Sequence, residues 1–155
     1  MAQGKNSFLK VWEPTWFVLD YEPARGYCFN ISLEVDNPFV RKRFTNDFGS
    51  PFRQDIPSSY HKLKDFVDKT LKMYKETLAN YEKALARAEE KLKVLGKNPL
   101  RHYKDTREGV NYRLLTKDFE DIQASMEIVK GNILLVESML GELNEIKQEY
   151  SINDL

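Results

Sequence analysis

The chain has 155 residues, of which 24 are Lys or Arg and 24 are Asp or Glu, so its formal net charge is zero. This length is enough to bury a core without disulfides, and the charge balance argues against a dedicated nucleic-acid-binding protein. Cys28 is the only cysteine, which excludes an internal disulfide and makes a cytoplasmic, reducing location the default expectation. The sequence lacks the run of about 18 apolar residues that a membrane span requires, so no membrane partner is expected.

The N-terminal part of the chain predicts a small antiparallel β-meander. Residues Tyr27 to Val35 alternate apolar and polar side chains, the period of two that a half-buried strand requires. Thr15 to Tyr21 is nearly continuous in apolar and aromatic residues, and the turn residues Glu22 to Gly26 separate these two strands. Phe8 to Trp12 is a weaker candidate strand. Three strands are therefore the simplest arrangement of this head.

Trp16 and Val18 are candidate partner-binding residues of the head. If Phe17 and Leu19 face the core, then Trp16 and Val18 point to the opposite side of the sheet. We expect either residues 36–57 of the same chain or a binding partner to cover them.

The segment that follows the strands has two interpretations. Asn37 as a cap, Pro38 at the first helical position and apolar residues near every fourth position predict a short helix, while a fourth strand over Phe39 to Thr45 is the alternative. It contains both basic residues and phenylalanines, a composition typical of surfaces that bind single-stranded nucleic acid. The candidate binding residues of this segment are Arg41, Lys42 and Arg43.

Residues 58–155 predict a long antiparallel two-helix coiled-coil hairpin, because two apolar seams repeat with an average spacing of about 3.5 residues. We expect a helix over 58–95, a tip loop over 96–113 and a helix over 114–150, with the last five residues frayed. Asp105 and Glu108 form a capping-box pattern that would start the second helix earlier. The seam residues are Val67, Leu71, Tyr74, Leu78, Tyr81, Leu85, Ala88, Leu92 and Leu95 in the first helix and Leu115, Phe119, Ile122, Met126, Val129, Ile133, Val136, Leu140 and Leu143 in the second.

The charges are divided between the two predicted helices. Residues 58–95 contain nine Lys/Arg and six Asp/Glu, residues 97–113 contain five and two, and residues 114–155 contain three and nine. A basic helix followed by an acidic helix favours pairing within one chain. A second apolar stripe beside the seams would bind the head near the open end of the hairpin or would pack against a second copy, so the oligomeric state stays open. The stripe contains Phe66, Met73, Ile128, Leu135, Met139 and Ile146.

The predicted fold class is therefore α+β, with a β-rich head in residues 1–57 and a helical hairpin in residues 58–155. The residues show no metal-ligand spacing and no glycine-rich phosphate loop, so we predict no catalytic, cofactor or metal site and do not expect an enzyme. We expect a non-catalytic module that binds another protein, such as an adaptor, an assembly component or an inhibitor. Nucleic-acid binding is the alternative. At the tip, the candidate residues are Arg101, Tyr103, Lys104 and Arg107.

Overall fold

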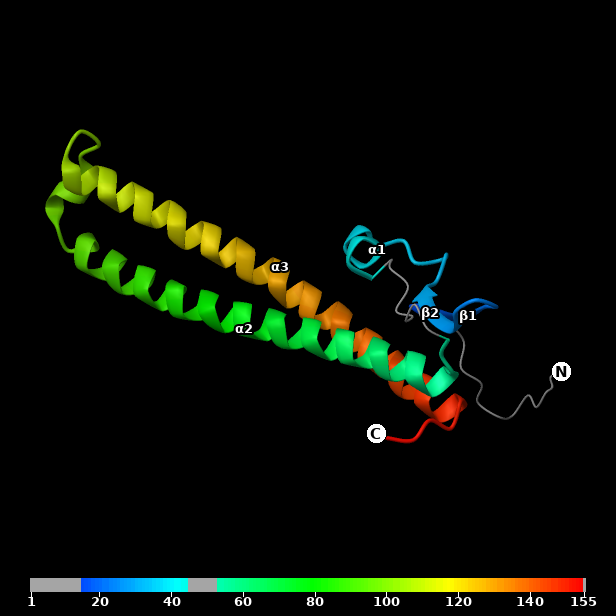
Figure 1. Ribbon diagram of the computed structural model, residues 1–155. Coiled ribbons are helices and arrows are strands. Elements are labelled where there is room, and N and C mark those ends of the chain that lie inside the picture. Colours follow the sequence, from blue (N-terminus) through cyan, green and yellow to red (C-terminus); the bar gives the residue numbers. More distant parts are fainter. Residues whose placement is uncertain (1–14, 45–52, 155) are drawn as a thin grey trace, which may run out of the picture. The chain divides into compact units, whose positions relative to one another are not determined.

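The computed structural model describes residues 15–44 and 53–154, and it confirms an α+β fold in which two long helices pack against each other (Figure 1). The contacts divide the chain into a head unit, Met1–Lys69 with Val136–Leu155, and a hairpin unit, Thr70–Leu135, and both long helices contribute to both units. The elements are β1 (Phe17–Glu22), β2 (Gly26–Ile31), α1 (Pro38–Phe44), α2 (Ile56–Gly96), the 3-10 helix η1 (Pro99–His102) and α3 (Arg107–Glu149).

The sheet of the head unit consists of β1 and β2, which pair antiparallel with Phe17 opposite Ile31 and Leu19 opposite Phe29. The expected third strand, Phe8 to Trp12, lies outside the described residues. The strand that we expected to reach Val35 ends at Ile31, and Leu33 is 90% exposed instead of facing the core. The alternation of residue types continues beyond the point where the strand stops.

The turn between the strands requires glycine at position 26. Gly26 has a φ of +84°, and a Cβ atom there would lie 2.3 Å from the backbone oxygen of Gln54. Both the left-handed conformation and the close approach exclude a larger side chain. Residues far apart in the sequence therefore meet at this turn.

Residues 38–44 form the helix α1, so the helical interpretation is confirmed and the alternative of a fourth strand is wrong. Asn37 caps the helix, since its Oδ1 accepts a hydrogen bond from the backbone N–H of Val40 at 3.1 Å. Val40 and Phe44 are completely buried, and the ring of Phe44 meets the ring of Phe66 edge to face with 5.3 Å between centroids. The apolar spacing of four residues thus anchors α1 on α2.

Both long helices begin before the expected ranges 58–95 and 114–150. Asp55 caps α2, because its Oδ1 accepts from the backbone N–H of Ser58 at 2.8 Å, so this helix begins at Ile56 instead of residue 58. Thr106 caps α3 in the same way by accepting from the backbone N–H of Gly109 at 3.1 Å. The α3 helix therefore starts at Arg107, close to the earlier start that the Asp105 and Glu108 pattern predicted and not at residue 114, and the tip loop is shorter than 96–113.

All the predicted seam residues are buried or half-buried, which confirms the heptad assignment. Within the hairpin unit, however, only three of them are fully buried among the described residues: Ala88, Met126 and Val129. Two helices alone leave the edges of a seam open to water. The head unit is better filled, since Leu63, Met139 and Ile146 are completely buried there as well.

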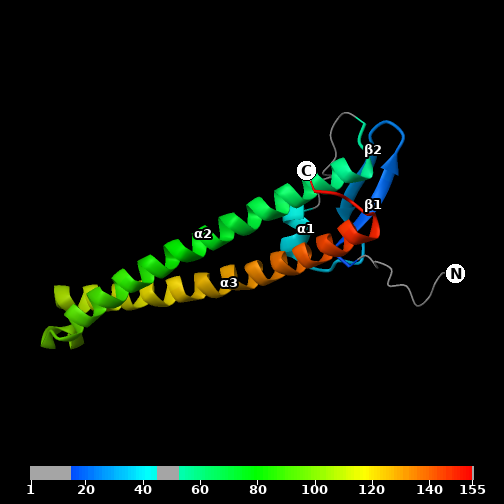
Figure 2. The same cartoon turned by 90° about the horizontal axis from the view of Figure 1, so that it is seen from below.

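A carboxylate of α3 holds the start of β1. Glu142 is 6% exposed, and its two oxygens accept hydrogen bonds from three consecutive backbone N–H groups: Thr15 at 3.0 Å, Trp16 at 2.9 and 3.0 Å, and Phe17 at 2.8 Å. On the other helix, the hydroxyl of Ser59 accepts from the backbone N–H of Phe29 at 3.2 Å. A side chain of each long helix thus binds the backbone of one strand. The two strands lie next to each other in Figure 2.

We expect Glu142→Ala to lower the free energy of unfolding by about 2 kcal/mol, because a buried N–H group left without an acceptor costs about 1 to 3 kcal/mol and the N–H of Phe17 is buried, while those of Thr15 and Trp16 are partly buried. Urea unfolding followed by far-UV circular dichroism measures the change. Glu120→Ala, at an exposed position of the same helix, is the matched control and should change stability by less than about 0.5 kcal/mol. Equal stability of the two variants would contradict the anchoring role of Glu142.

The cap of α2 predicts a pH-dependent contribution to stability. The hydrogen bonds from the backbone and side chain of Ser58 hold the pKa of Asp55 below its ordinary value of 3.8. A lowered pKa in the folded state means that this contribution is present above the ordinary pKa and is lost as the pH falls through the lowered value. We expect Asp55→Ala to cost about 1 kcal/mol at neutral pH and the difference from wild type to shrink in acid. Asp55→Asn should retain most of the stability, and unfolding curves of the three proteins across acidic pH test this.

Candidate functional site

The two candidate residues of the sheet make contacts within their own unit. The indole Nε1 of Trp16 donates a hydrogen bond to the hydroxyl of Ser138 on α3 at 3.1 Å, and the side chain is half-buried. Val18, also half-buried, pairs with Asn30 across the sheet. Helix α3 therefore contacts Trp16, which we expected residues 36–57 or a partner to cover.

The three basic candidates of α1 have different surroundings. The Arg41 guanidinium donates to the backbone carbonyls of Val35 at 2.8 Å, Leu33 at 2.7 Å and Ser32 at 3.2 Å. It therefore holds the connection between β2 and α1. Arg43 places its guanidinium 5.3 Å from the centroid of the Phe66 ring, and Lys42 is exposed.

The tip of the hairpin unit has a defined backbone structure. Asn98 caps η1 by accepting from the backbone N–H of Leu100 at 2.9 Å. The hydroxyl of Thr106 lies 3.0 Å from the carbonyl oxygen of Leu100 and 2.8 Å from that of Tyr103. A Cβ atom on Gly109 would lie 1.9 Å from the same Tyr103 oxygen, so the first turn of α3 packs directly on the loop.

This loop brings the predicted tip residues together on a single short segment. Arg101 is half-buried and donates to the carbonyl of Asn98 at 3.3 Å, while Lys104 and Arg107 are exposed and Tyr103 is 61% exposed. Three of the four side chains are therefore presented to solvent.

The structure adds exposed apolar side chains that the sequence reasoning missed. Val94 and Leu114 each directly precede a seam leucine and are 64% and 57% exposed. Next to them lies a groove of about 320 Å³ that is lined by Glu90, Lys91, Val94, Leu95 and Leu115. The signal available in the sequence was the heptad position beside the seam, which is apolar at both places.

We define the basic apolar tip as residues 91–117 of the hairpin unit. These residues contain eight Lys/Arg against two Asp/Glu, so the positive charge is concentrated in a chain whose net charge is zero. The tip also carries five large apolar side chains that are more than a third exposed: Val94, Leu100, Tyr103, Val110 and Leu114. Positive charge and apolar surface therefore occur in the same part of the chain.

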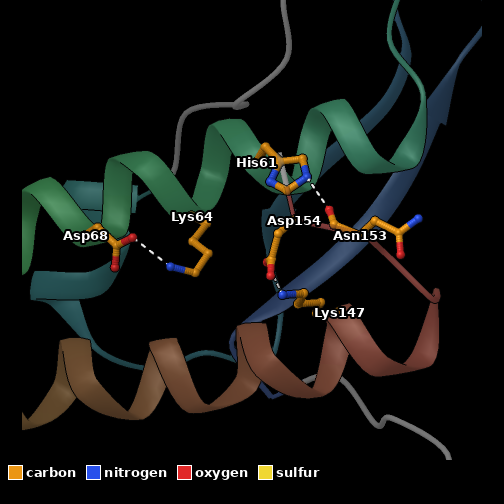
Figure 3. Close-up of polar contacts among 6 residues, drawn as sticks. All are labelled: His61, Lys64, Asp68, Lys147, Asn153 and Asp154. Atoms are coloured by element: carbon orange, nitrogen blue, oxygen red, sulfur yellow. Dashed lines mark hydrogen bonds and ion pairs between the residues drawn. The ribbon is translucent and has the colours of Figure 1, made fainter.

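A second polar cluster lies in the head unit, where the chain after α3 folds back on α2 (Figure 3). The imidazole Nε2 of His61 lies 3.0 Å from the carbonyl oxygen of Asn153, and Lys147 forms an ion pair with Asp154. That ion pair lowers the pKa of Asp154. Ile152 is buried, so the expectation that the last five residues fray is wrong for this part of them.

The charges of this cluster are matched within the chain. Lys64 binds Asp68 at 2.8 Å, and this hydrogen bond raises the pKa of Lys64. A hollow of about 520 Å³ beside the cluster is lined by residues of the last turn of α3 and the tail that follows it, including Lys147 and Ile152. Because Lys147 and Lys64 both have carboxylate partners, this cluster fastens the end of the chain and leaves the tip as the candidate site.

Within residues 15–44 and 53–154, no three His, Cys, Asp or Glu side chains come close enough to hold a metal ion. Over the same ranges, no helix has both the length and the apolar composition needed to cross a bilayer. No protein-family model, curated protein or solved structure matches the chain. The candidate site is therefore argued from its own residues.

The contact between Gly109 and the loop predicts an unusual response to alanine. In an ordinary helix, replacing Gly by Ala stabilises by up to about 1 kcal/mol. We expect Gly109→Ala to destabilise instead, because the new Cβ atom would overlap the Tyr103 carbonyl. Gly131→Ala is the matched control on the same helix, since nothing lies within 4 Å of its Cβ position, and it should stabilise. Thermal unfolding of both variants measures the opposite signs, and stabilisation by both would refute the close contact.

Proposed function

We propose that the protein is a non-catalytic protein-binding module whose basic apolar tip binds the partner. The observation that supports this is that Val94 and Leu114 are exposed in a segment with eight basic and two acidic residues, beside a groove that Glu90 also lines. Exposed apolar side chains bring affinity through burial, and positive charge selects an acidic partner and speeds association. An adaptor, an assembly component or an inhibitor would use such a surface.

The tip is better supported than the head as the binding surface. Trp16 and Arg41 already form hydrogen bonds within the head unit, and the guanidinium of Arg43 lies over the Phe66 ring. Lys104 and Arg107 at the tip are exposed instead. A partner would gain contacts at the tip without breaking contacts in the protein itself.

Nucleic-acid binding is the second candidate function, and the clustering of basic residues around the exposed Tyr103 favours it. The aliphatic character of Val94, Leu100 and Leu114 favours a protein instead, since single-stranded nucleic acids bind by stacking on aromatic rings.

We also infer a reducing compartment such as the cytoplasm, which is supported by the buried thiol of the single cysteine, Cys28.

The proposal predicts that two double variants of the tip lose partner binding. Val94→Asp with Leu114→Asp removes the apolar surface, and Lys104→Glu with Arg107→Glu reverses the charge. Each should weaken capture of the partner from a native lysate at least tenfold, which corresponds to about 1.4 kcal/mol. All four positions are exposed, so the variants should fold. Lys72→Glu with Leu134→Asp, at exposed positions outside the tip, is the matched control and should bind as wild type does.

Fluorescence anisotropy with short single- and double-stranded DNA and RNA distinguishes the second candidate. Nucleic-acid binding predicts micromolar or tighter affinity that falls steeply between about 50 and 200 mM salt. Protein binding predicts no such complex at the lower salt concentration. A steep salt dependence that Lys104→Glu with Arg107→Glu abolishes would replace the protein partner by a nucleic acid.

A further inference from the structure

The two sides of the hairpin unit have different chemistry. We define the apolar flank as five residues that each directly precede a seam residue: Met73, Val94, Leu114, Ile128 and Leu135. These residues occupy one heptad position, and equal positions lie on the same side of an antiparallel helix pair. In the head unit, the same position is occupied by Phe66 and Glu142. Phe66 contacts Phe44 of α1, and Glu142 binds the backbone of β1. The contacts of that unit therefore confirm that both helices present this position to one side.

Four of the five residues of the apolar flank are exposed, and Leu135 is half-buried. Ile128 is 66%, Val94 64%, Leu114 57% and Met73 42% exposed. The heptad position between the flank and the seam carries small, half-buried side chains such as Thr77, Ala84, Ser125 and Asn132. Small side chains permit a third helix to approach closely, and the groove beside Val94 and Leu95 lies on this flank.

The opposite side of the hairpin unit is charged. One heptad position on this side directly follows a seam residue, as Lys72 follows Leu71. Its charged residues, all exposed, are Lys72, Lys93, Arg113, Glu120 and Glu127. Leu134, which is 68% exposed, and the small residues Ala79 and Ala86 are the apolar exceptions at this position. A partner that needs apolar contact would therefore choose the apolar flank.

The charges on the apolar flank indicate the sign of its occupant. Arg87, Lys91 and Arg107 are exposed on this side and have no ion-pair partner in the part of the chain that the structure describes. Of the acidic residues on the same side, Asp121 pairs with Lys117 at 3.5 Å, which leaves Asp118 and Glu90, and Glu90 lines the groove. The excess of unpaired charge is positive, so an acidic surface is complementary.

We propose that the apolar flank binds one amphipathic α-helix of another protein, with a stripe of apolar side chains and acidic residues along its edges. This inference rests on the proposed function and names the class of partner. Helix-in-groove recognition uses anchors at helical spacing, and the partner helix would convert the two-helix pair into a three-helix bundle. From Met73 to Val94 the flank extends over roughly 30 Å at 1.5 Å per residue, the length of a helix of about 20 residues. A second copy of this chain is less suited, because it would bring the same basic excess to the same flank.

An unbiased selection tests the proposal. The full-length protein is used to select from a displayed library of helical peptides of about 20 residues with randomised surface positions. We expect the enriched peptides to be amphipathic and net acidic, and to become helical on binding by circular dichroism. Ile128→Asp and Val94→Asp should each weaken binding of the selected peptides at least tenfold. Leu134→Asp, which makes the same change at equal exposure on the opposite side, should bind them as wild type does.

The charge contribution is tested with a second pair of variants. Arg87→Glu with Lys91→Glu should weaken peptide binding at least tenfold and should invert the preference from acidic to basic peptides. Lys72→Glu with Lys83→Glu makes the same change of net charge at exposed positions outside both the flank and the tip, and should leave both affinity and preference unchanged.

The outcomes separate this inference from the proposed function. Peptides that bind Ile128→Asp as tightly as wild type but lose affinity for Lys104→Glu with Arg107→Glu would overturn the helix-binding flank and leave the tip as the binding site. Peptides insensitive to every one of these variants would overturn both. Failure to enrich any acidic amphipathic peptide would overturn the inference. A wild-type dimer in analytical ultracentrifugation that Ile128→Asp dissociates would also overturn it, because a second copy would then cover the flank.

Discussion

The fold of the head depends on one buried carboxylate. Glu142 is only 6% exposed, which would be costly for a polar side chain without partners, but its oxygens accept hydrogen bonds from the N–H groups of Thr15, Trp16 and Phe17. A two-stranded sheet is marginally stable by itself in water, so β1 and β2 need support from outside the sheet. Glu142 supplies it from α3, and Ser59 supplies it from α2 by binding the backbone N–H of Phe29. The strands are therefore ordered by the helices, and the same hydrogen bonds fix which side of each helix is covered.

This constraint explains how one repeating pattern serves two purposes. In the head unit, the heptad position directly before Val67 and Leu143 carries Phe66 and Glu142, which bind α1 and β1. In the hairpin unit, the same position carries Met73 and Ile128, which are exposed to solvent. Burying such side chains stabilises by about 25 cal/mol for each Å² removed from water. A helix pair that keeps apolar residues there without covering them offers a surface for association, and this is the physical basis of the proposed protein-binding function.

The features that could be predicted from the sequence are those that local patterns determine. Apolar residues at heptad spacing predicted the seams. Asn37 before Pro38 predicted α1, because helix caps act within a few residues. The end of β2 could not be predicted, since the guanidinium of Arg41 binds the carbonyls of the residues that continue the alternating pattern. Glu142 was not recognised because its partners lie more than a hundred residues earlier in the chain. For the candidate site, the basic residues of the tip were visible in the composition, whereas the exposure of Val94 depends on what packs beside it and required the structure.

The incomplete burial of the seam gives the proposed partner a further effect. Most seam side chains of the hairpin unit are half-buried, and Ala88, Met126 and Val129 are the fully buried ones among the described residues. A helix bound on the apolar flank would cover one open edge of the seam, so part of the binding free energy would come from completing the core of the hairpin unit. Ligands that bind the folded state alone stabilise it in proportion to the logarithm of their concentration. On this argument, partner binding and the stability of the hairpin are thermodynamically linked, and substitutions such as Ile128→Asp that leave the free protein folded would reduce the stabilisation that the partner provides.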